Sequence, residues 1–469
     1  MVRKARARRC GYNRCQRLTA YYSRLVSLPL TNWAGNVTFA AAGLHAPTSS
    51  DELRALVAHS DSLRVLGTAH SFNQIADTRA DLVSVAALPA SVEIDRDRRV
   101  ATVSAGMRYG DVATRLHAAG FALRNLGSLP HISVAGACAT GTHGSGATNG
   151  GLATSVNRIE IIRADGEIEQ LNRENDAEVF LGSVVSLGCV GVITKVGLDI
   201  VPTFDVEQYV YDNLPGDQLI DHFDEIVNAA YSVSLFTTWR GATIDQVWLK
   251  NKVNPAEPWR PEPHWMGATI ADSGRHPIAG MPVANCTAQL GVAGPWHERL
   301  PHFRLEFTPS AGDELQSEYL LPRAHAADAI RALLEIANQI APILQISEIR
   351  TIAADDLWLS PSYGRDSVAF HFTWIKDDAA VRPVLGAIEE RLAPFEARPH
   401  WGKVFTTEPS IVRTLYPRLP DFEKLMRRFD PAGKFRNAFT DRYVERTGGT
   451  SQANSPVSSA TAAGRGRRP

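Results

Sequence analysis

The feature that most constrains this chain of 469 residues is a short apolar stretch that runs into a glycine turn, Arg64-Val65-Leu66-Gly67-Thr68-Ala69-His70-Ser71-Phe72-Asn73. Such a stretch predicts a strand followed by a loop in which glycine lets the main chain approach a ligand closely. Exposed amides after such a turn can also hold a phosphate anion. A single loop histidine is more often an ordinary loop residue than a functional group, so this turn needs support from other parts of the chain.

A second stretch, from Asn125 to Gly146, is rich in glycine and other small residues. Such residues are poor material for a packed core and suit a backbone that lies flat against a large planar or phosphorylated ligand. On glycine content alone, a flexible surface loop is the slightly better interpretation. A third glycine turn, from Ser186 to Ile193, leads into an apolar strand and means little by itself. The three stretches are compatible with one extended cofactor cleft.

These stretches lack the signatures of several common sites. No Lys-Ser or Lys-Thr pair follows the glycines as in a nucleotide triphosphatase, and no Gly-x-Gly-x-x-Gly motif predicts a Rossmann dinucleotide site. His131 and His143 have no further ligand at the spacing of a zinc site, so we expect no metal. Gly144-Ser145-Gly146 lacks the spacing of a nucleophile elbow.

Composition and charge are those of an ordinary globular protein, with 44% hydrophobic and 21% charged residues and a formal net charge of −1. This charge predicts no general attraction to nucleic acid or membranes. No apolar run approaches the roughly 20 residues that span a bilayer. The five cysteines are scattered and odd in number, which argues against a disulfide framework and favours a reducing compartment. We therefore expect a cytoplasmic protein.

The two ends of the chain differ from its centre. Residues 1–28 hold eight basic residues and no acidic one, and the apolar run that follows is too short and too interrupted by proline for a signal peptide. A nucleic-acid-binding arm is one interpretation, but a solvated, disordered leader is the better one. Residues 447–469 carry almost no large apolar side chain, which predicts a disordered tail.

Between these ends, strand and helix patterns mix without a regular βαβ rhythm, which predicts an α+β fold. Ser49 to Glu52 reads as a capping box that opens a helix, and a second helix is expected from Tyr109 to Ala119, before Gly120. Alternation predicts hairpins at 92–106 and 158–171. Further strands are expected at 231–239, 246–249, 346–352 and 367–374. Helices are expected at 324–340 and 421–428, and a proline-rich connection at 255–282.

Two of the later strands carry polar side chains on one face. Because side chains alternate along a strand, Glu348 and Arg350 share a face of the first strand. In the second, His371 and Thr373 share a face opposite three aromatic residues. Such faces suit the polar floor of a pocket and, about equally well, an exposed surface with an ordinary ion pair.

The chain resembles the vanillyl-alcohol oxidase (PCMH-type) family of FAD flavoproteins and, more narrowly, the alditol (xylitol) oxidases. The resemblance covers roughly residues 31–440 and rests on the His70 loop and on residues 31–36, 128–136, 140–146, 295–304, 397–403 and 430–435. It implies a FAD-binding domain of two α+β subdomains and a substrate (cap) domain built on an antiparallel sheet flanked by helices. The implied boundaries are 31–203 for the FAD-binding domain, 204–400 for the cap, and 401–446 for a C-terminal segment that returns to the first domain and the active site.

The resemblance also implies FAD that is covalently bound through His70. Further cofactor contacts are expected from the three glycine-containing stretches, at Gly67, Thr68, Ala69, Ser71, Asn73, Gly127, Ser128, Ser133, Gly136, Gly141, Thr142, His143, Gly144, Gly191, Val192 and Ile193.

In alditol oxidases, the residues that line the substrate pocket over the flavin match Ser128, Glu348, Arg350, His371, Thr373 and Lys403. A carboxylate accepts hydroxyl protons, whereas arginine and lysine donate to hydroxyl oxygens, so this set suits a polyol. The implied reaction converts a terminal primary alcohol of xylitol or sorbitol to the aldehyde by hydride transfer to flavin N5, and O2 is reduced to H2O2.

Lys403, Arg350 and Glu348 are the expected catalytic residues. The two cations would stabilise the developing alkoxide and the anionic reduced flavin, and Glu348 would orient hydroxyl groups. Lys403 is alternatively the base, if a cationic neighbour lowers its pKa. In this family a small residue before the serine can open a path for O2, and Gly127 has no Cβ to block it.

Other functions stay open at this point. An aldonolactone oxidase has the same fold, although the Glu348/Arg350 and His371/Thr373 pairs favour an open-chain polyol. A non-catalytic flavin-binding protein and a nucleic-acid-binding protein that uses the basic leader are two further alternatives. We expect a monomer whose partners are a small polyol and O2, without nucleic acid or membrane.

Overall fold

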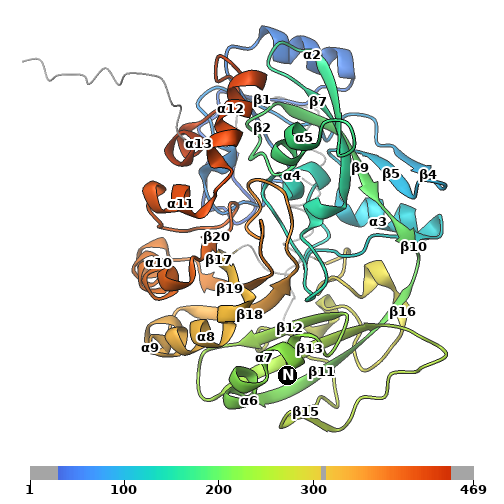
Figure 1. The fold of residues 1–469 in the computed structure, drawn as a ribbon, viewed down its shortest axis with the longest axis vertical. Coiled ribbons are helices and arrows are strands. Elements are labelled where there is room, and N and C mark those ends of the chain that lie inside the picture. The colour runs from blue at the N-terminus through green and yellow to red at the C-terminus, as the bar shows by residue number, and fades with distance from the viewer. Residues whose placement is uncertain (1–29, 308–312, 445–469) are drawn as a thin grey trace, which may run out of the picture.

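The structure, a computed structural model, describes residues 30–307 and 313–444. The predicted basic leader and tail lie outside the described residues. The chain forms an upper half of three smaller sheets with helices and a lower half built on one large sheet (Figure 1). In the described part of the chain, no helix has the length and apolar character needed to cross a membrane.

The upper half contains a parallel sheet in the order β1 (Gly43–His45), β3 (Asp81–Val83), β2 (Leu63–Val65). An antiparallel sheet follows in the order β4 (Val92–Asp95), β5 (Val100–Ser104), β9 (Val192–Asp199), β7 (Val156–Ile162), β8 (Ile168–Asn172). Both predicted hairpins are confirmed as β4–β5 and β7–β8. A two-stranded pair links β6 (Phe121–Ala122) to β10 (Val201–Pro202).

Two helices of this half begin or end where the sequence predicts. In α2 (Ser50–His59), the Ser49 side chain accepts a hydrogen bond from the Glu52 amide, which confirms one half of the predicted capping box. The Glu52 carboxylate accepts from the Thr48 amide rather than from that of Ser49. Helix α3 (Tyr109–Ala118) ends before Gly120, whose φ of 88° is easy only for glycine. This part of the chain also forms α4 (Val134–Ala139) and α5 (Ala177–Val184), neither of which has a side-chain cap hydrogen bond.

The large sheet of the lower half has ten strands within the described residues, and all of its strand pairs are antiparallel. Its order is β14 (His264–Trp265), β15 (Ala268–Ile270), β11 (Asp205–Pro215), β13 (Thr243–Lys252), β12 (Ser232–Thr237), β18 (Leu344–Ile352), β19 (Ser367–Ile375), β17 (Glu314–Pro322), β20 (Arg398–Pro399), with β16 (Gly294–Pro295) beside β11. The four strands expected past residue 230 are confirmed as β12, β13, β18 and β19.

The two faces of this sheet differ. On one face, apolar side chains of β12, β13, β17, β18 and β19 share a core with the helices α6 (Gly216–Asp221), α7 (Phe223–Val227), α8 (Ala326–Leu334) and α10 (Asp378–Leu392). Phe370, Phe372 and Trp374 all point into this core. The alternate residues of the same strands point toward the upper half, and this is the face that builds the site described below.

Three parts of the lower half differ from expectation. The single helix expected at 324–340 is divided into α8 and α9 (Ala337–Ile340), although Ile330, Leu333, Ile336 and Ile340 still share the core. The connection at 255–282 contains β14 and β15, which extend the sheet beyond β11. Strand β11 and helix α10 escaped prediction, because partner strands and tertiary packing rather than a strong local pattern determine them.

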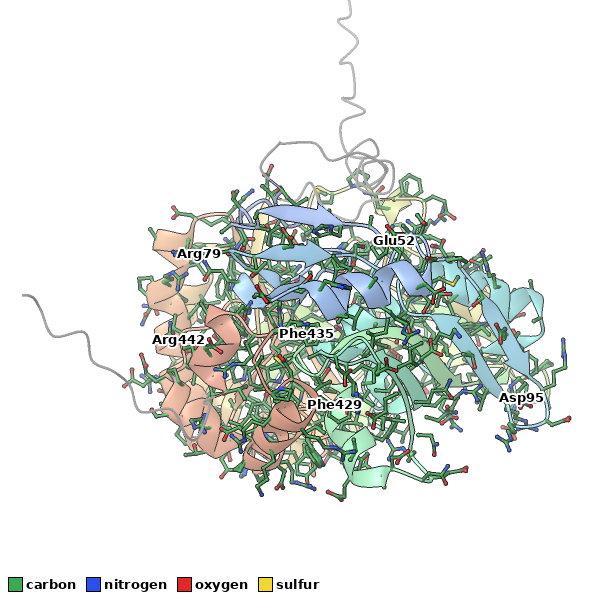
Figure 2. The ribbon with its side chains drawn as sticks, turned by 90° about the horizontal axis from the view of Figure 1, so that it is seen from above. Glu52, Arg79, Asp95, Phe429, Phe435 and Arg442 are labelled. Carbon is green, nitrogen blue, oxygen red and sulfur yellow. The ribbon has the colours of Figure 1, made fainter. Side chains whose placement is uncertain are left out.

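The last segment of the chain returns to the upper half as α11 (Pro409–Leu415), α12 (Leu419–Phe429) and α13 (Ala438–Tyr443), and α12 contains the helix expected at 421–428 (Figure 1). Phe429 and Phe435 belong to the same apolar cluster as Leu53 and Val57 of α2. Figure 2, seen from above, shows Phe435 beside α2. Packing of this kind joins two segments that are far apart in the sequence.

Candidate active site

A cavity of about 950 Å³ lies between the two halves. Its walls come from the loop around His70, from residues 127–143, from the 186–193 turn and from strands β17, β18 and β19. Fourteen residues of the expected cofactor set line it, namely Gly67, Thr68, Ala69, His70, Ser71, Asn73, Gly127, Ser128, Ser133, Gly136, Thr142, His143, Gly191 and Ile193. Segments that are distant in sequence therefore meet at one site.

Three residues expected at the cofactor do not line this cavity. A Cβ on Gly141 would lie 2.8 Å from Cδ of Pro361, and one on Gly144 would lie 2.3 Å from Oδ1 of Asn125. Val192 is fully buried in the core of the upper half. These positions serve the packing of the wall behind the cavity surface.

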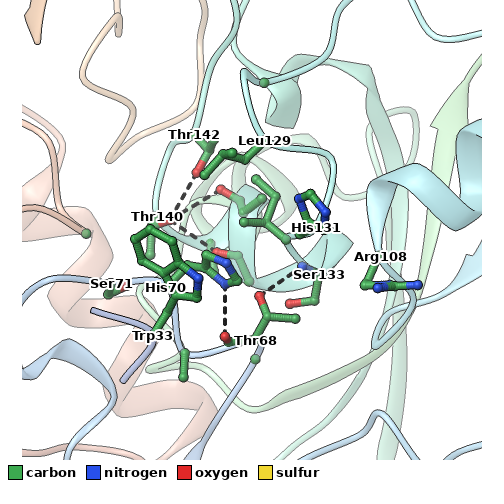
Figure 3. A pocket seen from close by; sticks show the side chains of 18 of the residues that line it. Trp33, Thr68, His70, Ser71, Arg108, Leu129, His131, Ser133, Thr140 and Thr142 are labelled. Atoms are coloured by element: carbon green, nitrogen blue, oxygen red, sulfur yellow. Dashed lines mark hydrogen bonds between the residues drawn. The ribbon is translucent and has the colours of Figure 1, made fainter. Parts of the chain in front are cut away.

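The histidine of the first glycine loop is held in a defined orientation (Figure 3). Nδ1 of His70 lies 2.9 Å from the carbonyl oxygen of Thr68, and the ring stacks on Trp33 at a centroid distance of 5.5 Å. Burial, with a smaller contribution from His131, lowers the pKa of His70 to about 4. The ring is therefore neutral at neutral pH and keeps a lone pair on one nitrogen.

The same loop is bonded to the segment that carries Lys403. The Asn73 side-chain amide donates to the carbonyl oxygens of Trp401 and Lys403, at 2.8 and 2.7 Å. The Phe72 amide donates to the carbonyl oxygen of Gly402 at 2.7 Å. Asn73 thus connects the cofactor side of the cavity to its substrate side. Its side-chain amide donates to main-chain carbonyl oxygens.

The walls of the upper half fit the FAD that the resemblance implies. A Cβ on either Gly67 or Gly136 would lie 2.7 Å from Oγ of Ser133, and a Cβ on Gly67 would lie 3.6 Å from the Cα of Gly136, so the His70 loop and helix α4 approach each other closely there. Such bare backbone suits a flat or phosphorylated ligand. The cavity volume is at the upper end of the range for small-molecule sites, about 300–1,000 Å³, and a neutral His70 is one of its lining residues.

The opposite wall is a polar floor formed by the large sheet. Glu318 on β17, His371 on β19 and Glu348 on β18 are paired across the three strands and form one row. Glu348, Arg350, His371 and Thr373 are only 5–7% exposed, and all line the cavity. The alternative of an exposed face with an ordinary ion pair is therefore excluded.

Hydrogen bonds join five of the six residues expected at the substrate into two groups, and Glu348 contacts Arg350 as an ion pair at 3.6 Å. Arg350 Nη1 lies 3.3 Å from Ser128 Oγ. Lys403 Nζ lies 2.5 Å from Gln316 Oε1 and 3.1 Å from His371 Nδ1. The other ring nitrogen of His371 lies 3.1 Å from Thr373 Oγ1.

The floor holds two carboxylates that remain ionised. Burial alone would raise the pKa of Glu348, but the charge of Arg350 and the contact with His302 outweigh it and hold the pKa well below its usual value. Burial would also raise the pKa of Glu318, but the surrounding His143, Arg350 and Lys403 hold it well below its usual value. Burial, with help from the charge of Lys403, lowers the pKa of His371 to about 4.

The sequence patterns did not single out Glu318 or His302. Glu318 is 2% exposed and alternates with Glu314 and Gln316 along β17, a period-2 polar pattern that was available as a signal. His302 lies within the stretch 295–304 that supports the resemblance, and its Nε2 is 2.7 Å from Glu348 Oε1. Glu318 contacts Arg350, 32 positions away in the sequence, and His302 contacts Glu348, 46 positions away. A local sequence pattern predicts neither contact.

The floor can bind several hydroxyl groups at once. The ionised Glu348 accepts hydrogen bonds, Arg350 and Lys403 donate them, and Ser128, Thr373 and His371 can do either. Among residues 30–307 and 313–444, no group of three histidine, cysteine or acidic side chains is arranged to hold a metal ion. The chemistry of the donor set is that of polyol recognition beside a cofactor cleft.

Comparison with known proteins agrees with this geometry. Residues 41–172 match the family described as FAD binding domain, and residues 313–443 match that of D-arabinono-1,4-lactone oxidase. A Streptomyces alditol oxidase is 52% identical over 421 residues, covering 88% of this chain and 98% of that protein. L-gulono-1,4-lactone dehydrogenase of Mycobacterium tuberculosis is 26% identical over 434 residues, again covering 88% of this chain and 98% of that protein.

Solved structures show the same architecture at low sequence identity. Cholesterol oxidase from B. sterolicum superposes with a TM-score of 0.73 at 14% identity, covering 90% of this chain and 97% of that one. This likeness establishes the fold, an FAD-binding domain of the PCMH type joined to a sheet-based second domain. With 52% identity over nearly the whole relative, the chain belongs to the alditol oxidase family of FAD flavoproteins.

Proposed function

We propose that the protein is an FAD-dependent oxidase that converts the terminal primary alcohol of an alditol, such as xylitol or sorbitol, to the aldehyde and reduces O2 to H2O2. One observation carries this proposal. Ser128, Glu348, Arg350, His371, Thr373 and Lys403 converge on one end of a cavity whose other walls are the glycine loops and His70. Membership of the alditol oxidase family supports the same substrate class.

Each residue of the floor has a role that follows from its charge. Bound FAD would supply the hydride acceptor and the electron path to O2. Arg350, whose pKa stays raised beside two carboxylates despite burial, donates to the reacting hydroxyl oxygen and stabilises the developing alkoxide. Glu348 accepts hydrogen bonds from hydroxyl groups and so orients the end of the polyol that reacts.

Lys403 is suited to take the hydroxyl proton at Nζ. Burial lowers its pKa to about 8 against the opposing charge of Glu318. A base works best when its pKa is close to the working pH, and a lysine with an unshifted pKa would hold its proton too tightly. His371, Thr373 and Ser128 remain to hold the more distant hydroxyl groups.

We propose further that His70 carries FAD covalently. The ring lines the cavity, its pKa of about 4 leaves it neutral, and the Thr68 carbonyl oxygen and Trp33 hold its orientation. A neutral imidazole has the lone pair that a bond to the flavin ring system requires. The denaturation experiment in the Discussion tests this link.

The domain boundaries, compartment and oligomeric state are proposals of the same kind. Two apolar clusters support a division between a FAD-binding domain (31–203) and a cap (204–400), because one draws mostly on residues 53–206 and 401–444 and the other mostly on 211–404. They cross this boundary where residues 296, 300 and 357–359 join the first cluster and Ala34 and Phe72 join the second. The buried free thiols of Cys138, Cys189 and Cys286 support a reducing cytoplasm. Size-exclusion chromatography with light scattering tests the proposed monomer.

The decisive experiment compares an open-chain polyol with a lactone. We expect anaerobic xylitol and sorbitol to bleach the visible absorbance of the bound flavin and, in air, to release H2O2. L-gulono-1,4-lactone is expected to react much more slowly. Faster bleaching by the lactone would favour the aldonolactone oxidase alternative, and bleaching by neither compound would favour a non-catalytic flavoprotein.

A further inference from the structure

Glu318 is the most enclosed charged residue of the polar floor. Its carboxylate on β17 is 2% exposed, and nitrogen atoms of side chains from four other segments surround it. Arg350 Nη2 lies 2.5 Å from Oε1, and His143 Nε2 lies 3.2 Å from the same oxygen. Oε2 lies 3.7 Å from His371 Nδ1 and 3.8 Å from Lys403 Nζ.

The orientation of the Arg350 guanidinium depends mainly on this carboxylate. Its contact with Glu318 is the shortest one, whereas Nη1 is 3.3 Å from Ser128 Oγ and Nε is 3.6 Å from Glu348 Oε2. Hydrogen bonds between ionised partners are roughly twice as strong as neutral ones. Without Glu318, Arg350 would keep only the two longer contacts.

Lys403 is coupled to the same carboxylate. Burial is the main cause that lowers its pKa, and Glu318 is the first of the charges that oppose this effect. Other charged or titratable groups around Glu318 and Lys403 come from every neighbouring element, namely Glu314 on β17, Glu348 and Arg350 on β18, His371 on β19, and His143 and His400 on loops. Removing the charge of Glu318 would therefore lower the pKa of Lys403 further, because the positive charge of Arg350 would no longer be opposed by this carboxylate.

We propose that Glu318 is a positioning residue for the oxidation of the alcohol. Its carboxylate holds the Arg350 guanidinium against the reacting hydroxyl and maintains the proton affinity of Lys403 Nζ. Glu318 acts through these two cations, whereas Glu348 acts on the polyol directly. This role rests on the proposed alditol oxidase function.

The test replaces Glu318 by glutamine, which keeps the shape and removes the charge. In the wild-type protein, we expect the rate of anaerobic flavin reduction by saturating xylitol to rise with pH as Lys403 loses its proton near pH 8. In Glu318→Gln this rise should move to lower pH by about 1 unit or more, the size of shift expected from losing one opposite charge. The KM for xylitol should also increase by about tenfold.

Two further variants make the comparison specific. Glu423→Gln removes a 3% exposed carboxylate that pairs with Arg413 at 2.5 Å, outside the cavity, and should leave the pH profile and KM unchanged. Glu318→Asp keeps the charge and should keep the midpoint of the profile near the wild-type value while raising KM. This variant also tests the role if Glu318→Gln does not fold.

A second measurement requires no turnover. The pKa of Lys403 in the folded protein, about 8, is below the unfolded value of about 10.4, so the unfolded chain binds more protons between these values and stability rises with pH there. In Glu318→Gln the thermal midpoint should begin to rise at lower pH, and adding Lys403→Met should remove the difference. If Glu318→Gln changes neither the pH at which the thermal midpoint begins to rise nor the pH dependence of flavin reduction, the proposed role of Glu318 is wrong. A wild-type protein that oxidises no alditol would instead overturn the proposed function.

Discussion

Nε2 of His302 lies 2.7 Å from Oε1 of Glu348, and both side chains are buried at the edge of the polar floor. Burial lowers the pKa of His302 to about 4, so a neutral ring donates its N–H to an ionised carboxylate. Lys250 fixes the segment just before this histidine, because its ammonium donates to the carbonyl oxygens of residues 299, 300 and 301. The orientation of Glu348 is thus set from a loop outside the two polar strands.

Replacing His302 by phenylalanine should weaken polyol binding. The ring volume between Phe236 and Trp248 is kept, but Glu348 loses its hydrogen bond. A hydrogen bond to a charged group contributes about 1.5–3 kcal/mol, so we expect KM for xylitol to rise at least tenfold. Steady-state kinetics measure this, with the exposed His264→Phe as control. An unchanged KM would show that Glu348 is oriented by other contacts.

Replacing Lys403 by methionine should abolish reduction of the flavin by xylitol while the purified protein stays yellow. The methionine fills similar space but offers neither a base nor a donor at Nζ. Loss of one such group typically costs at least about 100-fold in rate. Stopped-flow absorbance under anaerobic conditions is the measurement, and the exposed Lys424→Met is its control. Normal reduction in Lys403→Met would remove Lys403 from the mechanism.

Replacing His70 by alanine should release FAD from the polypeptide upon denaturation. In the wild-type protein, yellow colour is expected to remain with the precipitated chain after acid treatment. His131→Ala is the matched control, because His131 lines the same cavity and contacts the carbonyl oxygen of Leu305. It should retain the colour. Flavin that stays attached to His70→Ala through denaturation would contradict the proposed covalent bond.

Replacing Gly127 by alanine tests access of O2. A Cβ there would lie 3.7 Å from the His143 carbonyl oxygen and 3.8 Å from Thr142 Cγ2, both ordinary contacts, so the variant should fold. We expect slower reoxidation of the reduced flavin by O2, severalfold at most, and unchanged reduction by xylitol. Gly386→Ala, at an open position of α10, is the control. Equal reoxidation rates in all three proteins would exclude Gly127 from the oxygen path.

Stability should fall as the pH is lowered from about 6.5 to 4. Burial is the main cause that lowers the pKa of His302 and His371 to about 4 and that of His400 to about 3. Since the usual histidine pKa is about 6.5, the unfolded chain binds more protons in this range, and stability present above pH 6.5 is lost on acidification. Thermal midpoints measured from pH 7.5 to 4.5 check this, and His302→Phe should show a smaller decrease than His264→Phe.

Strand faces and helix ends could be predicted from the sequence, because they depend on residues that are close together in the chain. Alternation along β18 and β19 predicted which side chains share a face, because the period of a strand leaves no other arrangement. The cap at Ser49 and the stop at Gly120 depend on neighbouring backbone groups and were predicted for the same reason. For the helix expected at 324–340, the predicted apolar face is confirmed, but the prediction of one continuous helix is wrong, since the segment forms α8 and α9.

The strand patterns thus predicted which polar side chains share a face, and the resemblance pointed to FAD and an alditol. Whether that face is a solvent surface or a buried floor depends on the long-range packing, since it is the upper half that covers the sheet. This packing also brought Glu318 and His302 to Arg350 and Glu348. Long-range contacts also place the His70 loop, because Asn73 bonds it to the segment that carries Lys403. Such contacts join residues far apart in the chain, and no local period encodes them.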